Sequence, residues 1–517
     1  MVIHMENDKM RTAIIDIGSN TIRLVVYDFS DELGLREIDN IKVVARLRNY
    51  LQADGNMSVE GIQLLAKNLR MFKQIIDDYQ VADVQAFATA AVRQANNREH
   101  ILDMMYKEVD LEITLLSEDE EAFFGFFGVA YTMKTPSAIT IDIGGGSTEI
   151  TCYERKELVH SISFPVGTVS LKQQFVKDNR MTGKEKTSLN QYIKEQFEQV
   201  EWLKDCKLPV IGIGGSARNI GQVHQNRTNY PATGIHQYEL SHEAFDDVKE
   251  YIEQLSFDEL QQLDGLSSDR ADIIEIAIEV FSALMTVVQA PSFQISKKGL
   301  REGTMIHRIL ELEPLAFHKQ DIYTNVAKRF IREFGRTELQ ASDLVMLATS
   351  MYIESCSIGL FEQSDQDMNM IKRAATVYAI GEYIELDEYS PHTFHLIANQ
   401  SLIGLTHKER IQLALIASYK NKDTFYRQMA PFETWFTKEE SKKMKDFGAL
   451  LKFIYALYVS KRKVVNRLVL TEANGELIIN IFTNTSALAE IYQANKRKKH
   501  IEKMAKMPVR LYFIEEG

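Results

Sequence analysis

Three short glycine-rich segments constrain the fold of this chain more than any other feature. They read DIGSNT at residues 16–21, DIGGGSTE at residues 142–149 and GIGGSA at residues 212–217, and each follows an apolar run typical of a β-strand. Glycine lets the backbone turn sharply and lets a ligand approach main-chain amides, and clusters of such amides bind phosphate. Two aspartate-headed loops and a third on another strand therefore predict two similar half-domains that hold a phosphate chain between them.

The order of expected elements repeats along the first 300 residues. Strand, glycine turn and strand are expected over residues 13–27, followed by a strand at 41–47 and an amphipathic helix at 58–79. The strand–turn–strand pattern starts again at residue 138, and a long helix is expected at 269–289. Strands interleaved with helices predict an α/β fold, and the repeated start predicts a duplication with a cleft between the halves.

The sequence pattern changes after about residue 310. Helical periodicity dominates residues 323–461, and two strand-like runs at 465–471 and 477–483 then flank Asn474-Gly475. An Asn-Gly pair between two strands is a strong hairpin signal. The sequence therefore predicts a helical region followed by a small α/β domain.

Composition and charge limit the possible partners and the compartment. The formal net charge is -12, whereas nucleic-acid binders are usually basic, so we expect no specific nucleic-acid partner. The basic runs at residues 461–463 and 496–500 could bind a polyanion or could simply be solvated helix ends. No apolar run reaches the roughly 18 residues that span a bilayer. Three cysteines without CxxC spacing predict reduced thiols in a cytoplasmic protein.

Five motifs taken in order resemble the exopolyphosphatase / guanosine pentaphosphate phosphohydrolase family. They are DIGSNT, SEDEEA at 117–122, DIGGGSTE, GIGGSA and GLREG at 299–303, and the match runs through roughly residues 11–305. That family belongs to the actin-like and sugar-kinase superfamily. The resemblance therefore implies two duplicated ribonuclease-H-like (actin-like) lobes with a cleft, followed by an all-α HD-like domain and a small C-terminal α/β domain.

The resemblance to the long form of the family also implies domain boundaries. We expect lobe I at residues 1–134, lobe II at 135–310, the helical HD-like domain at 311–460 and the small α/β domain at 461–517. A metal-dependent HD site needs a His-Asp or His-Glu pair, and Tyr378-Ala379 stands at that position here. His392 and His395 alone do not make a site. We expect a non-catalytic module that extends a channel for long polyanions or forms a homodimer interface.

Phosphoryl hydrolysis needs neutralised phosphate charge and a positioned water. The loop residues expected to bind substrate phosphate are Gly18, Ser19, Asn20, Thr21, Gly144, Gly145, Gly146, Ser147, Gly214, Gly215 and Ser216. Asp16, Asp142 and Glu149 are expected to hold Mg²⁺, which prefers carboxylates, waters and phosphate oxygens. A strand-end aspartate that hydrogen-bonds its own turn is the alternative.

The residue expected to activate the attacking water is Glu121. A carboxylate at a helix start is also favoured by the helix dipole, so capping is the alternative from physics alone. The resemblance implies that the catalytic glutamate is the second of the Glu-Glu-Ala triplet, which is Glu121.

Arg93 resembles the arginine of the family's corresponding segment. A guanidinium pairs bidentately with phosphate, so we assign Arg93 to substrate phosphate. The expected catalytic set is Glu121, Arg93, Asp142 and Glu149.

Three functions remain open at this point. The first is an exopolyphosphatase that releases orthophosphate from inorganic polyphosphate with Mg²⁺ and Glu121 as base. The second is a guanosine pentaphosphate 5′-phosphohydrolase, and the third is a non-catalytic sensor of a phosphorylated ligand. Glu275, Ile276 and Ala277 stand where the family commonly has Pro and Gly. Bulkier side chains there are expected to crowd a base pocket, which favours the narrow polyphosphate substrate.

Overall fold

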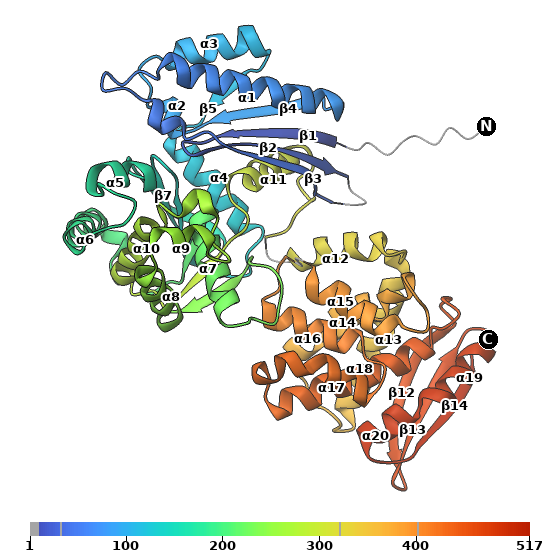
Figure 1. Ribbon diagram of the computed structural model, residues 1–517. Helices are drawn as coiled ribbons and strands as arrows, with labels where there is room; N and C mark the ends of the chain where they lie inside the picture. The colour runs from blue at the N-terminus through green and yellow to red at the C-terminus, as the bar shows by residue number, and fades with distance from the viewer. Residues whose placement is uncertain (1–9, 31–33, 320–321, 401–402, 517) are drawn as a thin grey trace, which may run out of the picture. The chain divides into compact units, whose positions relative to one another are not determined.

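The chain divides into two compact units. The computed structural model describes residues 10–30, 34–319, 322–400 and 403–516 (Figure 1). The first unit is Met1–Tyr230 with Ile235–Asn325, and the second is Pro231–Gly234 with Val326–Gly517. Both predicted actin-like lobes lie in the first unit. Within the described ranges, no helix is long and apolar enough to cross a membrane.

The first lobe is built on a five-stranded sheet in the order β3-β2-β1-β4-β5 (Figure 1). Its strands are β1 (Met10–Ile17), β2 (Thr21–Phe29), β3 (Arg36–Val44), β4 (Asp83–Ala88) and β5 (Ile113–Leu115). The first three strands form an antiparallel meander, and β4 pairs parallel with β1. Helices α1 (Val59–Asp78) and α3 (Arg98–Val109) cover one face, with Leu65, Leu69, Phe72 and Met105 in the shared core.

The second lobe repeats this plan in the order β10-β11-β9-β6-β7-β8. Strands β6, β7 and β8 form the meander, and β9 pairs parallel with β6. The strands are β6 (Ala138–Ile143), β7 (Thr148–Glu154), β8 (Glu157–Phe164), β9 (Val210–Ile213), β10 (Tyr238–Ser241) and β11 (Ser292–Ile295). The helices are α5 (Thr168–Phe175), α6 (Gly183–Glu198), α7 (Gly214–Arg227), α8 (His242–Gln254), α9 (Phe257–Gln262) and α10 (Ile274–Val288). This repeat confirms the predicted α/β duplication.

The two lobes exchange a covering helix. Helix α4 (Glu118–Ala130), from the first half of the chain, packs on the second sheet, and α11 (Leu300–Leu312), from the second half, packs on the first sheet. The two helices cross at glycines. A Cβ added to Gly303 would lie 1.9 Å from the carbonyl oxygen of Phe124, and one added to Gly128 would lie 2.3 Å from that of Gly299. Only glycine therefore permits this approach.

Three expected elements of the first unit differ from the structure. Strand β3 ends at Val44, and residues Leu47–Tyr50 form a 3₁₀ turn after Arg46, which has a left-handed backbone (φ 45°). The helix expected at 269–289 begins only at Ile274, after a short 3₁₀ turn at Ser268–Arg270. The third glycine segment is not a loop, because α7 begins at Gly214 directly after β9.

The second unit is helical up to Ala456 and ends in a small sheet. Its helices are α12 (Ile322–Glu333), α13 (Glu338–Ser357), α14 (Asp365–Val377), α15 (Tyr389–Asn399), α16 (His407–Ala417), α17 (Lys422–Met429) and α18 (Lys438–Ala456). The sheet has the order β12-β13-β14, from β12 (Val465–Ala473), β13 (Glu476–Thr483) and β14 (Val509–Glu515), with α19 (Leu488–Arg497) and α20 (Lys499–Ala505). Asn474 and Gly475 both have positive φ, as a tight hairpin turn requires.

A structural tyrosine stands at the position that the resemblance implied for an HD pair. The Tyr378 hydroxyl is buried and donates to the carbonyl oxygen of Tyr419 at 3.0 Å. His395 lies beside Asn399 on the same helix, with 3.1 Å between Nδ1 and Nδ2. Over the part of the chain that the structure describes, no three His, Cys, Asp or Glu side chains gather as a metal-binding group.

Candidate active site

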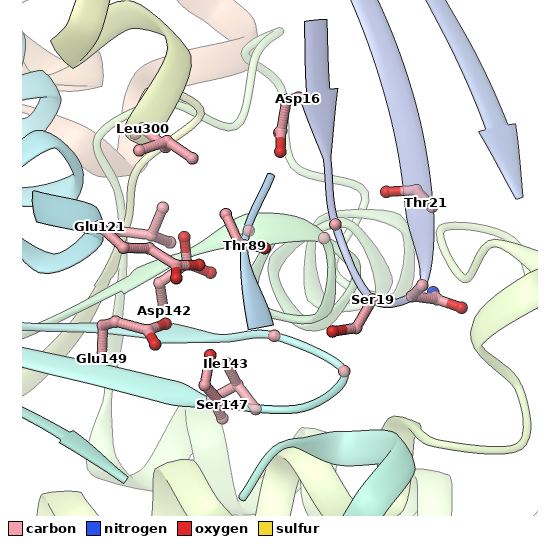
Figure 2. A pocket seen from close by; sticks show the side chains of 18 of the residues that line it. Asp16, Ser19, Thr21, Thr89, Glu121, Asp142, Ile143, Ser147, Glu149 and Leu300 are labelled. Carbon is pink, nitrogen blue, oxygen red and sulfur yellow. The ribbon is translucent and has the colours of Figure 1, made fainter. Parts of the chain in front are cut away.

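A pocket of about 150 Å³ lies where the glycine-rich segments of the two lobes meet (Figure 2). The predicted phosphate-binding residues that line it are Gly18, Ser19, Asn20, Thr21, Gly144, Gly145, Ser147, Gly214 and Gly215. Gly146 and Ser216 do not line the pocket. Gly146 packs behind the first loop, since a Cβ there would lie 3.0 Å from Ser19 Oγ. The Ser216 hydroxyl is buried without a hydrogen-bond partner among the described residues.

The first two segments form matching turns that face each other. Gly18 N donates to the Thr21 carbonyl at 3.0 Å, and Gly144 N donates to the Ser147 carbonyl at 2.9 Å. A Cβ on Gly145 would lie 3.0 Å from Ser19 Cβ, so the two turns are almost in contact. Because one turn belongs to each lobe, main-chain amides of both lobes face the cavity and can bind an anion there.

The third segment adds a helix N-terminus to the same cavity. Gly214 has φ +86°, and a Cβ there would lie 2.8 Å from Asp142 Oδ1. A Cβ on Gly215 would overlap the guanidinium of Arg270, at 2.2 Å from its Cζ. Glycine therefore allows the first turn of α7, whose amides have no intrahelical partner, to approach both an acidic and a basic side chain.

Three carboxylates point toward one another on one side of the pocket: Glu121 at the start of α4, Asp142 in β6 and Glu149 in β7 (Figure 2). Burial raises the pKa of Glu121 to about 7, against the opposing charge of Arg93. Burial, helped by the charge of Asp16, raises the pKa of Asp142 to about 6. Burial and then the charge of Glu121 raise the pKa of Glu149 well above its ordinary range. Clustered acids with raised pKa values are typical of catalytic sites.

Arg93 binds Glu121 and does not line the pocket. Its Nη1 donates to Glu121 Oε2 at 2.9 Å and to the Leu116 carbonyl at 2.8 Å. This ion pair can orient the Glu121 carboxylate. The predicted contact of Arg93 with substrate phosphate stays a prediction. The motif identified the residue, but its partner depends on how the segment after β4 packs against α4.

Five cationic side chains of the described residues line the pocket. They are Arg23, Arg218, Arg270, Lys297 and Arg301. Burial, together with the charges of Arg301 and Arg218, lowers the pKa of Arg23 to about 10. Cations crowded into a cleft attract anionic ligands. Only Arg301 lies in a recognised motif, GLREG; the others come from distant segments that folding brings together.

The three carboxylates predicted to hold magnesium do not form one group. Asp16 lies apart from Asp142 and Glu149 (Figure 2), and its Oδ2 is 3.8 Å from Arg301 Nη1. Among the described residues, no three His, Cys, Asp or Glu side chains are arranged so that they could hold a metal ion by themselves. Asp142 and Glu149 are neighbours across the β6–β7 pair. These two oxygen donors beside the amide turns fit Mg²⁺ if phosphate and water complete the shell, as this ion commonly requires.

The residues expected to crowd a base pocket lie elsewhere. Ile276 and Ala277 are buried in the core of the second lobe. Glu275 Oε1 pairs with Arg180 Nη2 at 2.8 Å. None of the three lines the pocket, so they give no preference between a polyphosphate and a nucleotide.

The duplicated sheets, the facing glycine turns and the cationic pocket define a two-lobed, actin-like phosphate-binding protein. Residues 25–312, more than half of the chain, match the Ppx/GppA phosphatase family. The chain belongs to that family. Its exopolyphosphatase and GppA relatives are phosphoanhydride hydrolases, which is the enzyme class of this protein.

Three curated relatives differ in how much of the chain they match. The bifunctional 3-dehydroquinate synthase/phosphatase of Fusobacterium nucleatum is 25% identical over 53% of this chain, which spans only 43% of that protein. The guanosine-5'-triphosphate,3'-diphosphate pyrophosphatase of Pseudoalteromonas translucida is 24% identical over 80% of each chain. Exopolyphosphatase 1 of Mycobacterium tuberculosis is 24% identical over 58% of this chain and 88% of its own.

Solved structures match the two-lobed unit. The crystal structure of the Aquifex aeolicus member of the Ppx/GppA family superposes with a TM-score of 0.52 at 25% identity, covering 59% of this chain and 99% of that one. An exopolyphosphatase from Cytophaga hutchinsonii gives a TM-score of 0.53 at 22% identity, over 58% and 98% of the two chains. The second shows the fold alone.

Proposed function

We propose that this protein is an exopolyphosphatase that removes terminal orthophosphate from inorganic polyphosphate. The observation that carries the proposal is the Glu121 carboxyl group, which lines the pocket beside the glycine turns and has a pKa raised to about 7. A base whose pKa lies near the working pH is ionised often enough and still accepts a proton readily. The amide turns and the five cations supply the charge neutralisation that phosphoryl transfer needs.

Each part of the pocket has a role in this reaction. The amides of Ser19, Asn20, Gly145 and Ser147 hold the terminal phosphate. Arg301 and Arg23 neutralise the chain behind it. Glu121 orients the attacking water and accepts its proton. Arg93 holds the Glu121 carboxylate in position through the 2.9 Å ion pair.

Asp142 and Glu149 would hold Mg²⁺ together with phosphate oxygens and water. When bound, the ion would neutralise charge on the phosphate that is transferred. Two of the three residues first expected to bind metal keep that role in this proposal. The third, Asp16, pairs instead with Arg301.

Guanosine pentaphosphate is the second candidate substrate. The observation that favours it is the share of this chain that each relative matches. The pyrophosphatase of Pseudoalteromonas translucida matches 80% of this chain, whereas the mycobacterial exopolyphosphatase matches 58%. Both reactions break a phosphoanhydride bond with the same pocket chemistry.

Orthophosphate release by the purified protein with Mg²⁺ distinguishes the two candidates. We expect release from long-chain polyphosphate, and a rate at least about 10²-fold lower for Glu121→Gln because the general base is lost. Glu120→Gln is the matched control: Glu120 accepts from Ser117 N at 2.8 Å in a capping box, and glutamine can keep that contact. Release from guanosine pentaphosphate but not from polyphosphate would favour the second candidate. An unchanged rate for Glu121→Gln would contradict the mechanism.

A further inference from the structure

A second pocket adjoins the active site and shares Asn20 with it. This pocket has a volume of about 320 Å³ and is lined by residues of both lobes. Asn20 lines both cavities and is only 9% exposed. Its Nδ2 has no hydrogen-bond partner among the described residues. A buried amide donor without a partner is costly, so a ligand with acceptor oxygens at this junction would satisfy it.

The charged side chains of the second pocket are two cations that share one carboxylate. Arg46 follows β3, and its Nη2 lies 3.3 Å from Asp272 Oδ1. Lys172, on α5, places its Nζ 2.9 Å from Asp272 Oδ2. The Asp272 side chain is 12% exposed, whereas those of Lys172 and Arg46 are 20% and 39% exposed. The group keeps one net positive charge, and both cations retain access to solvent and to a ligand.

The remaining lining of this pocket favours a phosphate group over a nucleobase. Asn49 and Gln173 add side-chain amides, and Gln173 Nε2 lies 3.4 Å from Asn49 Oδ1. No aromatic ring is among the lining residues that the structure describes. The pocket therefore lacks the stacking surface that commonly holds a base, but it offers several N–H donors to anionic oxygens.

We propose that the second pocket is a phosphate subsite that holds the substrate chain next to the phosphates bound by the glycine turns. Asn20 bridges the two cavities, and Lys172 and Arg46 bind the phosphate oxygens in competition with Asp272. This inference rests on the proposed polyphosphate substrate and assigns a path to the chain beyond its terminal phosphate.

Two substitutions with opposite expected effects on polyphosphate affinity separate this role from a purely structural one. Removing a cation by Lys172→Gln should weaken binding of long-chain polyphosphate by about tenfold, the loss expected for one hydrogen bond to a charged group. Removing the competitor by Asp272→Asn should strengthen that binding. If the three residues only join the lobes, both substitutions would weaken it. Lys184→Gln removes an equal charge from an exposed position of the same lobe and serves as the control.

The binding measurement is made by calorimetry in the Glu121→Gln background, so that hydrolysis does not interfere. Opposite shifts for Lys172→Gln and Asp272→Asn would support the subsite, whether or not the active protein releases orthophosphate from polyphosphate. Shifts in the same direction, or a Lys172→Gln affinity equal to that of Lys184→Gln, would overturn it even if orthophosphate release is confirmed. The two proposals can therefore fail separately.

Discussion

The ionisation of Glu121 depends on a balance between burial and one ion pair. Burial and the charges of Asp142 and Asp16 favour the protonated acid, whereas Arg93 favours the carboxylate. In the proposed mechanism the Glu121 carboxylate accepts a proton, so this balance sets the lowest pH at which hydrolysis proceeds. Because Glu149 and Asp142 interact with Glu121, the apparent pKa values seen in kinetics belong to the group and not to Glu121 alone.

The pH dependence of kcat/KM should reveal this balance. For hydrolysis of polyphosphate, we expect activity to fall as the pH drops below about 7, because Glu121 then becomes protonated. Arg93→Gln removes the opposing positive charge, raises the pKa of Glu121 and moves this acid limb to higher pH. Arg70→Gln, an exposed arginine paired with Glu108, should leave the limb in place. A limb at the same pH in both variants would exclude the proposed role of Arg93.

Glu149 should make stability depend on pH. Its pKa in the folded protein is raised, mainly by burial, above the value of about 4.3 for an unfolded glutamate. The folded state therefore binds the proton more tightly, and this contribution to stability is lost as the pH rises through the folded pKa. Glu149→Gln removes the titration, so its Tm relative to the unmutated protein should be higher at pH 8 than at pH 5. Equal differences at the two pH values would refute this.

Single residues were predictable where their role is local. The turns at residues 16–21 and 142–149 could be identified because glycine and a following hydroxyl act within one loop. Arg23, Arg218 and Arg270 could not be assigned, since they come from β2, from α7 and from the segment before α10 and meet only in the fold. The separation of Asp16 from Asp142 and Glu149 could not be predicted for the same reason, because it depends on the packing of the lobes.

At the scale of elements, the crossing of α4 and α11 positions Glu121, the proposed general base. Helix α4 carries Glu121 in its first turn, and α11 contributes Arg301 to the same pocket. The glycine contacts fix how closely the two helices approach. A change at the crossing should therefore alter both stability and the pocket.

Gly303→Ala tests this crossing. Its Cβ would lie 1.9 Å from the Phe124 carbonyl oxygen, so we expect the free energy of unfolding in urea to fall by about 1–3 kcal/mol, as for other overpacked sites, together with lower activity. Gly183→Ala is the control, since nothing lies within 4 Å of its added Cβ; it should be neutral or stabilising by up to about 1 kcal/mol. Full activity and stability for Gly303→Ala would contradict the role given to the crossing.

Helices and strands were predicted correctly where apolar residues recur regularly over many residues. They were missed where an element begins with glycine. The helix expected at 58–79 is α1, Val59–Asp78, because six apolar side chains recur on one face. The helix that begins at Gly214 was missed, since glycine is a poor helix former and tertiary contacts with Asp142 and Arg270 decide its place. The exchange of α4 and α11 leaves no local signal in the sequence.

At the scale of the whole molecule, a related solved structure is matched over nearly its whole length by little more than half of this chain. The Aquifex aeolicus structure is covered over 99% of its length by 59% of this chain. The core of the first unit extends beyond residue 310, because Ala316 and Phe317 pack against the first sheet and the rings of Phe317 and Phe29 lie 6.0 Å apart. The expected boundary at residue 310 thus falls inside this cluster.

Truncation should show where the catalytic unit ends. A fragment of residues 1–319 should fold and release orthophosphate, whereas residues 1–310 should be less stable by about 1–3 kcal/mol because the Phe317 contact is lost. Thermal unfolding and phosphate release provide the measurements. If the helical region guides long chains, the 1–319 fragment should also prefer shorter polyphosphate than the full protein. An unchanged chain-length preference would exclude that role.

Light scattering on the full protein tests the predicted homodimer.

The exchanged helix also has a consequence for biosynthesis. Ile14, Val25, Tyr27 and Phe29 lie under Met305 and Ile309 of α11. On a ribosome that adds about 5–20 residues per second, the apolar face of the first sheet must wait roughly tens of seconds for the helix that covers it. The nascent chain therefore exposes this apolar surface throughout synthesis of the second lobe. Binding of a chaperone to the surface during that interval would protect the chain from aggregation.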